Sequence, residues 1–235
     1  MQWYANADYS YKNRYFATLS VLAEANSRFG KNASNALKAV GVKWAIFPSV
    51  QLGWVMSNEN WFPKSTALNY LRINAGFDMS GNDGISNYAT ATTFSTVRFN
   101  YTQIGVQLTN VGNDQVKWET TTKWNIGLQA NFLTNRLGLN FNYYIHNTNN
   151  LLTLKSFDNP IGGINNYWIN SGSLRNVGFE AGINGKPVAT RDWHMELGVT
   201  VGHYKNEVCS LPEGSFTTSV YGEDNILTSV GNPVA

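Results

Sequence analysis

The sequence predicts an all-β protein made of antiparallel transmembrane strands, and three observations support this. Apolar and polar residues alternate with a period of two in about eight segments, the pattern of strands with one apolar face. The longest segment, KWETTTKWNIGLQANFL at residues 117–133, exceeds the ~9–11 residues that a tilted strand needs to cross a bilayer. Short and long connections alternate along the chain, which is typical of a membrane-spanning barrel.

The first four predicted strands are residues 3–10, 15–24, 49–56 and 71–78. In each, alternate positions are aliphatic or aromatic, and the positions between them are mostly polar or glycine. The apolar positions are Trp3, Ala5, Ala7, Tyr9, Tyr15, Ala17, Leu19, Val21, Ala23, Val50, Leu52, Trp54, Met56, Leu71, Ile73, Ala75 and Phe77.

The last four predicted strands are residues 117–133, 137–147, 176–184 and 193–204. Their polar positions carry Gly, Asn, Gln, Thr, Glu and Lys, which suits a wet barrel interior. The apolar positions are the even residues from Trp118 to Phe132, then Leu137, Leu139, Phe141, Tyr143, Ile145, Val177, Phe179, Ala181, Ile183, Trp193, Met195, Leu197, Val199 and Val201.

The connections predict that the two ends of the sheet differ. Three are short and rich in turn-forming residues, and 57–70 is intermediate. Long segments lie between them, so we expect short periplasmic turns at one end and long extracellular loops at the other. The short connections are residues 11–14, 134–136 and 185–192, and the long segments are 25–48, 79–116, 148–175 and 205–235.

The composition of the 235 residues favours the same interpretation. Charged residues make up 14% of the chain, well below the ~25–35% usual for a soluble surface. The net charge of +2 gives no reason to expect a nucleic-acid partner. Two alternatives stay open: a self-contained small outer-membrane barrel that serves as adhesin, anchor or narrow pore, and a soluble carbohydrate-binding β-sandwich, whose strands would also alternate.

Four aromatic residues occupy apolar positions near predicted strand ends, namely Trp54, Trp118, Tyr143 and Trp193. Aromatic side chains gather at the two interfaces of membrane barrels, where an apolar ring meets polar headgroups. We therefore expect these four to form membrane girdles. The alternative is that they pack in an ordinary protein core.

The sequence predicts no enzyme, no metal site and no cofactor. No G-x-S-x-G motif is present, and no His or Cys residues follow ligand spacing. Residues 78–86, DMSGNDGIS, resemble a calcium loop, but Asp83 stands where that loop needs glycine and Ala89 where it needs glutamate. We expect a turn there, in which Asn and Asp bond their own backbone.

Four stretches carry a family resemblance when taken together and in this order. They are NRYFATLSVLAEANSRFG at 13–30, FPSVQLGWVMSNENWF at 47–62, LNYLRINAGFDMSGNDGI at 68–85 and KWETTTKWNIGLQANFLTNRLGLNFNYYIHNTNNLL at 117–152. This series resembles the barrel of SusC/RagA-type TonB-linked outer-membrane transporters. The likeness extends over the chain to about Asn206.

The resemblance implies a fold, a location and partners. Such transporters have barrels of about 22 strands with a plug in the lumen, in the outer membrane of Gram-negative bacteria. They import glycan or peptide fragments, draw energy from the TonB complex and carry a SusD-like surface lipoprotein as a lid. Residues 1–235 would then be a partial barrel domain, and we expect the plug, the signal peptide, the TonB-contacting segment and the last strands to lie outside it.

Aromatic residues in two long connections are candidates for ligand contact: Tyr88 in 85–101, and Tyr167 and Trp168 in 159–172. Aromatic faces stack on sugar rings, and the neighbouring Asn and Gly residues can reach hydroxyl groups. These rings are therefore candidates to meet an oligosaccharide or peptide. We favour the alternative that the loops pack on themselves or against the lid lipoprotein, since loops of this length usually pack on themselves.

Overall fold

The computed structural model describes most of the chain as strands. The only helix among the described residues is a single 3-10 turn, η1 (Met56–Asn58). No described helix has the length and apolar composition that a membrane crossing requires. The described residues are 1–30, 32–33, 37–39, 42–63, 65–99, 103–212, 215–220 and 224–234.

Eight antiparallel strands form the main sheet in the order β1-β2-β4-β5-β8-β9-β12-β13. Neighbours in this order are hydrogen-bonded to each other, and the order follows the sequence. Each strand contains most of one predicted segment, which confirms the all-β antiparallel prediction. Their bounds are β1 (Gln2–Tyr11), β2 (Tyr15–Ala25), β4 (Val42–Val55), β5 (Leu68–Asn82), β8 (Glu119–Phe132), β9 (Leu137–Asn149), β12 (Ser173–Ala189) and β13 (His194–Ser210).

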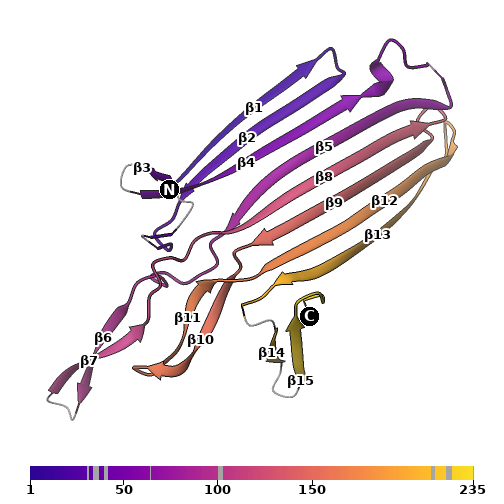
Figure 1. Ribbon diagram of the computed structural model, residues 1–235. Coiled ribbons are helices and arrows are strands. Elements are labelled where there is room, and N and C mark those ends of the chain that lie inside the picture. The colour runs from indigo at the N-terminus through magenta and orange to yellow at the C-terminus, as the bar shows by residue number, and fades with distance from the viewer. Residues whose placement is uncertain are drawn as a thin grey trace.

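The sheet is one curved layer, and its two ends differ as expected (Figure 1). The links β1–β2, β4–β5, β8–β9 and β12–β13 lie together at one end, which we call the short-turn end. The links β2–β4, β5–β8 and β9–β12, together with the chain after β13, lie at the opposite, long-loop end. The short and long connections that alternate along the sequence therefore lie at opposite ends of the sheet.

The short turns bend through left-handed backbone. Lys12 and Asn13 have φ of 51° and 53°, and the turn is closed by Arg14 N–H donating to the Tyr11 carbonyl at 2.9 Å. In the β8–β9 turn, Leu133, Thr134 and Asn135 all have positive φ. Asn tolerates this region better than most residues, which explains its place in both turns.

Seven shorter strands were not predicted. They are β3 (Leu37–Ala39), which pairs with β4, and three separate two-stranded ribbons: β6 (Thr93–Phe99) with β7 (Gln103–Asn110), β10 (Leu152–Ile161) with β11 (Ile164–Asn170), and β14 (Ser215–Val220) with β15 (Asp224–Ser229). Figure 1 shows the ribbons at the long-loop end. A two-stranded ribbon that projects from a sheet need not bury one whole face, so its sequence need not alternate clearly.

Several main strands also run further toward the long-loop end than predicted. β4 begins at Val42 rather than at 49, and its ladder with β2 continues to Ala25↔Trp44. Its ladder with β5 ends at Ser49↔Asp78, next to Pro48, which has no N–H to donate. Backbone pairing thus continues past the segment in which the side chains alternate.

The apolar face of the sheet is exposed. Trp124 on β8 and Val199 on β13 keep 56% and 67% of their surface open, and among the described residues no second sheet packs against this face. The alternative expectation of a soluble two-layer sandwich is therefore wrong. β1 and β13 stand at opposite ends of the strand order, so the described strands do not close into a small barrel either.

Candidate functional site

The long connections join one another at the long-loop end through backbone hydrogen bonds. Gly30 N–H donates to the Val116 carbonyl at 3.0 Å, and Asn32 N–H donates to the Asp114 carbonyl at 2.9 Å. A Cβ at Gly30 would lie 1.8 Å from the Asp114 carbonyl oxygen, so only glycine permits this approach. The β2–β4 link is thereby held against the segment that leads into β8.

A second set of bonds joins the β9–β12 connection to the same segment. The Asn170 side chain accepts from Lys117 N–H at 2.7 Å and donates to the carbonyls of Lys117 and Asn150 at 2.8 and 2.9 Å. Asn113 Nδ2 donates to the Trp168 carbonyl at 3.0 Å. We call the joined residues 26–30, 32–33, 83–92, 111–118 and 150–172 the loop cluster.

The loop cluster covers two small hydrophobic cores. One contains Ile85, Ala89 and Val116, with Val116 only 1% exposed. The other contains Trp118 and Phe47, whose rings meet edge to face at 5.5 Å, together with Ala45. Phe29, Leu152 and Trp168 pack against the first core, and Leu22, Phe29 and Met79 pack against the second. These cores give the loop cluster its own packing.

A polar hollow of about 440 Å³ lies in the loop cluster. Tyr167 brings an aromatic ring to it, and Lys117 and Lys155 bring two cations. Four amide side chains surround them, so the hollow offers donors and acceptors beside one ring face. Its lining residues are Asn32, Asn113, Gln115, Val116, Lys117, Lys155, Tyr167, Ile169 and Asn170.

The three predicted ligand aromatics lie in different surroundings. Tyr167 lines the hollow and stacks on Phe157 with ring centroids 4.5 Å apart. Trp168, its neighbour on β11, packs against the core of Ile85, Ala89 and Val116. Tyr88 is 73% exposed, has a φ of 63° and does not line the hollow. Of the three, Tyr167 is therefore the one whose side chain lines the polar hollow.

The four predicted girdle residues also lie in different surroundings. Trp193 is exposed beside the β12–β13 turn, Tyr143 is exposed on the apolar face of β9, and Trp54 is partly exposed near the short-turn end of β4. Trp118 is 9% exposed and packs against Phe29 with ring centroids 4.5 Å apart. Placing Trp118 in a girdle was wrong, because the strand begins only at Glu119 and the loop cluster covers the ring.

The polar face of the sheet carries a second, open hollow of about 490 Å³. Its rings are contributed by β9 and β13, and Tyr144 stacks on His146 with centroids 4.9 Å apart. Sequence reasoning identified these positions as interior-facing but did not select them, because their grouping depends on the register of four strands. The lining residues are Asn125, Asn142, Tyr144, His146, Asn176, Glu180 and Tyr204.

A polar cluster ties the short-turn end together. Glu59, which follows η1, is 8% exposed; it accepts from the Tyr15 hydroxyl at 2.5 Å and from Trp54 Nε1–H at 3.1 Å, and it pairs with Arg14 at 3.1 Å. The Tyr15 hydrogen bond first, and then the Trp54 hydrogen bond and the Arg14 charge, lower the pKa of Glu59 below its usual value.

The calcium-like segment continues β5 as far as Asn82 and then turns. Gly84 N–H donates to the Asn82 side chain at 3.0 Å, and Asp83 Oδ2 accepts from Arg28 Nη1 at 3.3 Å and from the Asn26 amide. Within the part of the chain that the structure describes, no three His, Cys, Asp or Glu side chains gather as metal ligands would.

A family model described as TonB dependent receptor-like, beta-barrel matches residues 1–235. The chain belongs to this family. "TonB-dependent receptor P3" of Formosa agariphila is 31% identical over 220 residues, which cover 90% of this chain and 20% of that protein. "TonB-dependent receptor SusC" of Bacteroides thetaiotaomicron is 30% identical over 241 residues, which cover 99% of this chain and 23% of that protein.

The fold of this TonB-dependent receptor chain also matches solved barrels. The structure of the RagAB peptide transporter superposes with a TM-score of 0.83 at 23% identity, over 99% of this chain and 24% of that one. The "closed-closed" RagAB peptide importer gives the same TM-score and coverage. The chain thus spans about a quarter or less of the length of these relatives, and its open sheet corresponds to part of a larger barrel wall.

Proposed function

We propose that this chain forms part of the barrel wall and the extracellular loops of an outer-membrane, TonB-dependent importer of glycan or peptide nutrients. The observation that carries the proposal is the family match over residues 1–235, on a sheet whose apolar face is exposed. That face would meet lipid hydrocarbon, and the opposite polar face would line the lumen. SusC and RagAB, which are among the relatives, support the transport assignment.

The orientation in the membrane follows from the two ends of the sheet. Barrels of this class place short turns toward the periplasm and long loops outside. We therefore place Trp54 and Trp193 near the periplasmic interface, with Tyr143 on the lipid face. The loop cluster would face the medium, where a SusD-like surface lipoprotein would close over it. Contact with the TonB complex would be made by parts of the protein outside these residues.

The hollow beside Tyr167 is the proposed contact for cargo on the extracellular side. Its ring can stack on a sugar or a side chain, while amides and ammonium groups bind hydroxyl, carbonyl or carboxylate oxygens. Trp168, by contrast, supports the core beneath. Tyr88 lacks this setting, because its side chain is exposed and does not line the hollow. We propose no catalytic role for these residues.

Uptake by intact cells tests the transport function. Labelled oligosaccharide and peptide mixtures are given to cells with and without the protein, with and without an uncoupler of the proton gradient. We expect uptake to need both the protein and the gradient. Uptake that is indifferent to both would refute import.

The cargo contact is tested separately by Tyr167→Ala, with Phe94→Ala as the matched control, because Phe94 is exposed on β6 and does not line the hollow. Loss of a stacked ring is expected to weaken cargo affinity about tenfold, while the control leaves it unchanged. Equal affinity in both variants would remove the hollow from the proposal and leave import standing.

A further inference from the structure

Two cations on the apolar face are not explained by the proposed import. Lys205 on β13 lies in a ladder row whose other outward residues are apolar, and Arg175 lies on β12 in the next row toward the long-loop end. The apolar members of the Lys205 row are Ala7, Leu19, Val50, Phe77, Trp124, Ile145 and Val177. A charge on a face that meets lipid is costly unless an opposite charge or water meets it.

The cations lie at the edge of the apolar band. The outward positions of β13 are apolar from Trp193 to Val201, which is about 26 Å along the strand at ~3.3 Å per residue. At the usual barrel tilt this corresponds to a height of about 20 Å, close to the ~25 Å of a barrel's apolar band. His203, Lys205 and Glu207 follow at once, so they lie at headgroup depth on the side of the long loops.

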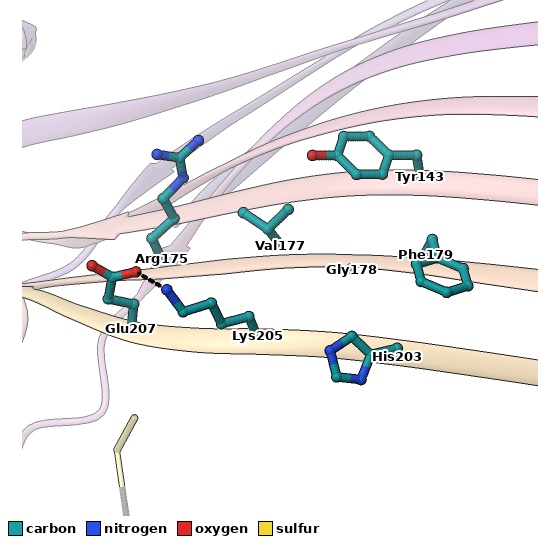
Figure 2. A pocket seen from close by; sticks show the side chains of 8 residues that line it. All are labelled: Tyr143, Arg175, Val177, Gly178, Phe179, His203, Lys205 and Glu207. Atoms are coloured by element: carbon teal, nitrogen blue, oxygen red, sulfur yellow. Dashed lines mark hydrogen bonds and ion pairs between the residues drawn. The ribbon is translucent and has the colours of Figure 1, made fainter. Parts of the chain in front are cut away.

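The side chains around the two cations leave positive charge in excess. Lys205 Nζ pairs with Glu207 Oε2 at 2.9 Å, as the dashed line in Figure 2 marks, and Glu207 is also the ladder partner of Arg175. Among the described residues that line this hollow, Glu207 is the one carboxylate beside two cations, and His203 on β13 lies near them. An added anion would restore the balance of charge.

A hollow of about 350 Å³ joins these charges to an apolar floor. In Figure 2 the charged groups of Arg175, Lys205 and Glu207 gather at one end, and Tyr143 and Phe179 lie toward the other, with Val177 between them. A ligand with a phosphate at one end and hydrocarbon at the other would satisfy both parts. Free phosphate would satisfy only the first part.

From these observations we infer that this hollow binds the phosphate-bearing headgroup of an outer-leaflet lipid. Arg175 and Lys205 contact the phosphate, and Val177, Phe179 and the Tyr143 ring pack against the start of the acyl chains. The inference rests on the membrane orientation in the proposed function, but not on import. Such a lipid would hold β12 and β13 at a fixed depth beneath the loop cluster.

Native mass spectrometry of the natively expressed protein in detergent tests the inference. The probes are bisphosphorylated lipid A and the same lipid after phosphatase treatment. The wild-type protein is expected to bind the phosphorylated lipid at least about tenfold more tightly, because charge-assisted hydrogen bonds to phosphate are lost with the second probe. Equal affinity for the two lipids would overturn the inference.

Variants test whether the phosphorylated lipid binds in this hollow. Arg175→Gln with Lys205→Gln should weaken binding of the phosphorylated lipid about tenfold or more. Lys12→Gln with Arg191→Gln, which removes two cations at the short-turn end, should leave it unchanged. Glu207→Gln should tighten binding, a gain that a misfolded protein would not show. Unchanged binding in the Arg175 and Lys205 double variant overturns the inference.

Two further measurements distinguish a bound lipid from other possible occupants of the hollow. If millimolar inorganic phosphate displaces the lipid completely, the hollow is a free-anion site rather than a lipid site. If the double variant changes the oligomeric state and not lipid binding, the face is a contact between copies. Nutrient uptake by the double variant should persist, so failure of the lipid inference is distinguishable from failure of the import proposal.

Discussion

The main sheet and the loop cluster place their hydrophobic side chains in opposite ways. In the sheet, apolar residues such as Trp124 and Val199 are more than half exposed. In the loop cluster, Ile85, Ala89 and Val116 are almost fully buried, although they lie in connections rather than in strands. A soluble β-protein would show the reverse, with buried strand residues and exposed loops.

This difference reflects the environment that each region requires. The sheet is held by its backbone ladders, and its apolar side chains need an apolar environment outside the protein. In the proposed orientation the loop cluster meets water, so it needs a core of its own and many side chain to backbone hydrogen bonds. We therefore expect the sheet to be destabilised most by charges on its apolar face, and the loop cluster by loss of its internal contacts.

The largest expected effect is from a charge on the apolar face. Val199→Arg should destabilise the membrane-inserted protein by about 2–4 kcal/mol, because a cation would enter hydrocarbon. Thr200→Arg, one residue along β13 and on the polar face, is the matched control and should cost much less. Urea unfolding in lipid vesicles measures both; equal costs would mean that the two faces meet the same solvent.

The next effect is from separating the loops. Gly30→Ala brings a Cβ against the Asp114 carbonyl and should cost about 1–3 kcal/mol, chiefly within the loop cluster. Gly127→Ala in β8 is the control, since its nearest atom lies 3.6 Å from the new Cβ. Hydrogen exchange should rise at residues 111–118 in the first variant only. Unchanged exchange there would show that the loop contact contributes little.

A smaller effect is expected from Asn170→Ala, which removes the hydrogen bonds that this side chain makes with the backbone of Lys117 and with the Asn150 carbonyl. The cost is about 1–2 kcal/mol of local stability. The exposed Asn166→Ala on β11 serves as the comparison. Faster amide exchange at Lys117 in the first variant, with the main sheet unaffected, is the expected result, and slower or equal exchange would contradict it.

The smallest effect concerns Glu59 at the short-turn end. Its folded pKa is lowered, so its stabilisation is complete above the unfolded-state pKa and is lost as the pH falls through the folded value. Glu59→Gln should therefore be less stable than wild type at neutral pH and equal to it in strong acid. Unfolding measured across this range tests the sign; a difference that grows toward acid would contradict it.

Much of the sheet could be predicted because period-two alternation is a local property. Each strand needs an apolar face whichever neighbours it has, so residues 117–133 or 193–204 reveal their conformation alone. The turns at Asn13 and Asn135 were predictable for the same reason. The girdle prediction for Trp118 was wrong because the alternation of apolar and polar residues extends one residue before β8, which begins at Glu119. Periodicity also cannot show which residues cover a ring.

The sequence by itself determined the strands, the apolar and polar face of each strand and the separation of short from long connections, since these depend on residue type and spacing along the chain. Only the tertiary structure decided that Tyr167 lines a polar hollow while Trp168 packs beneath it, and that Arg175 lies across the ladder from the carboxylate that pairs with Lys205. Those relationships join residues on different strands and loops. They depend on register and on loop packing, which long-range backbone pairing sets.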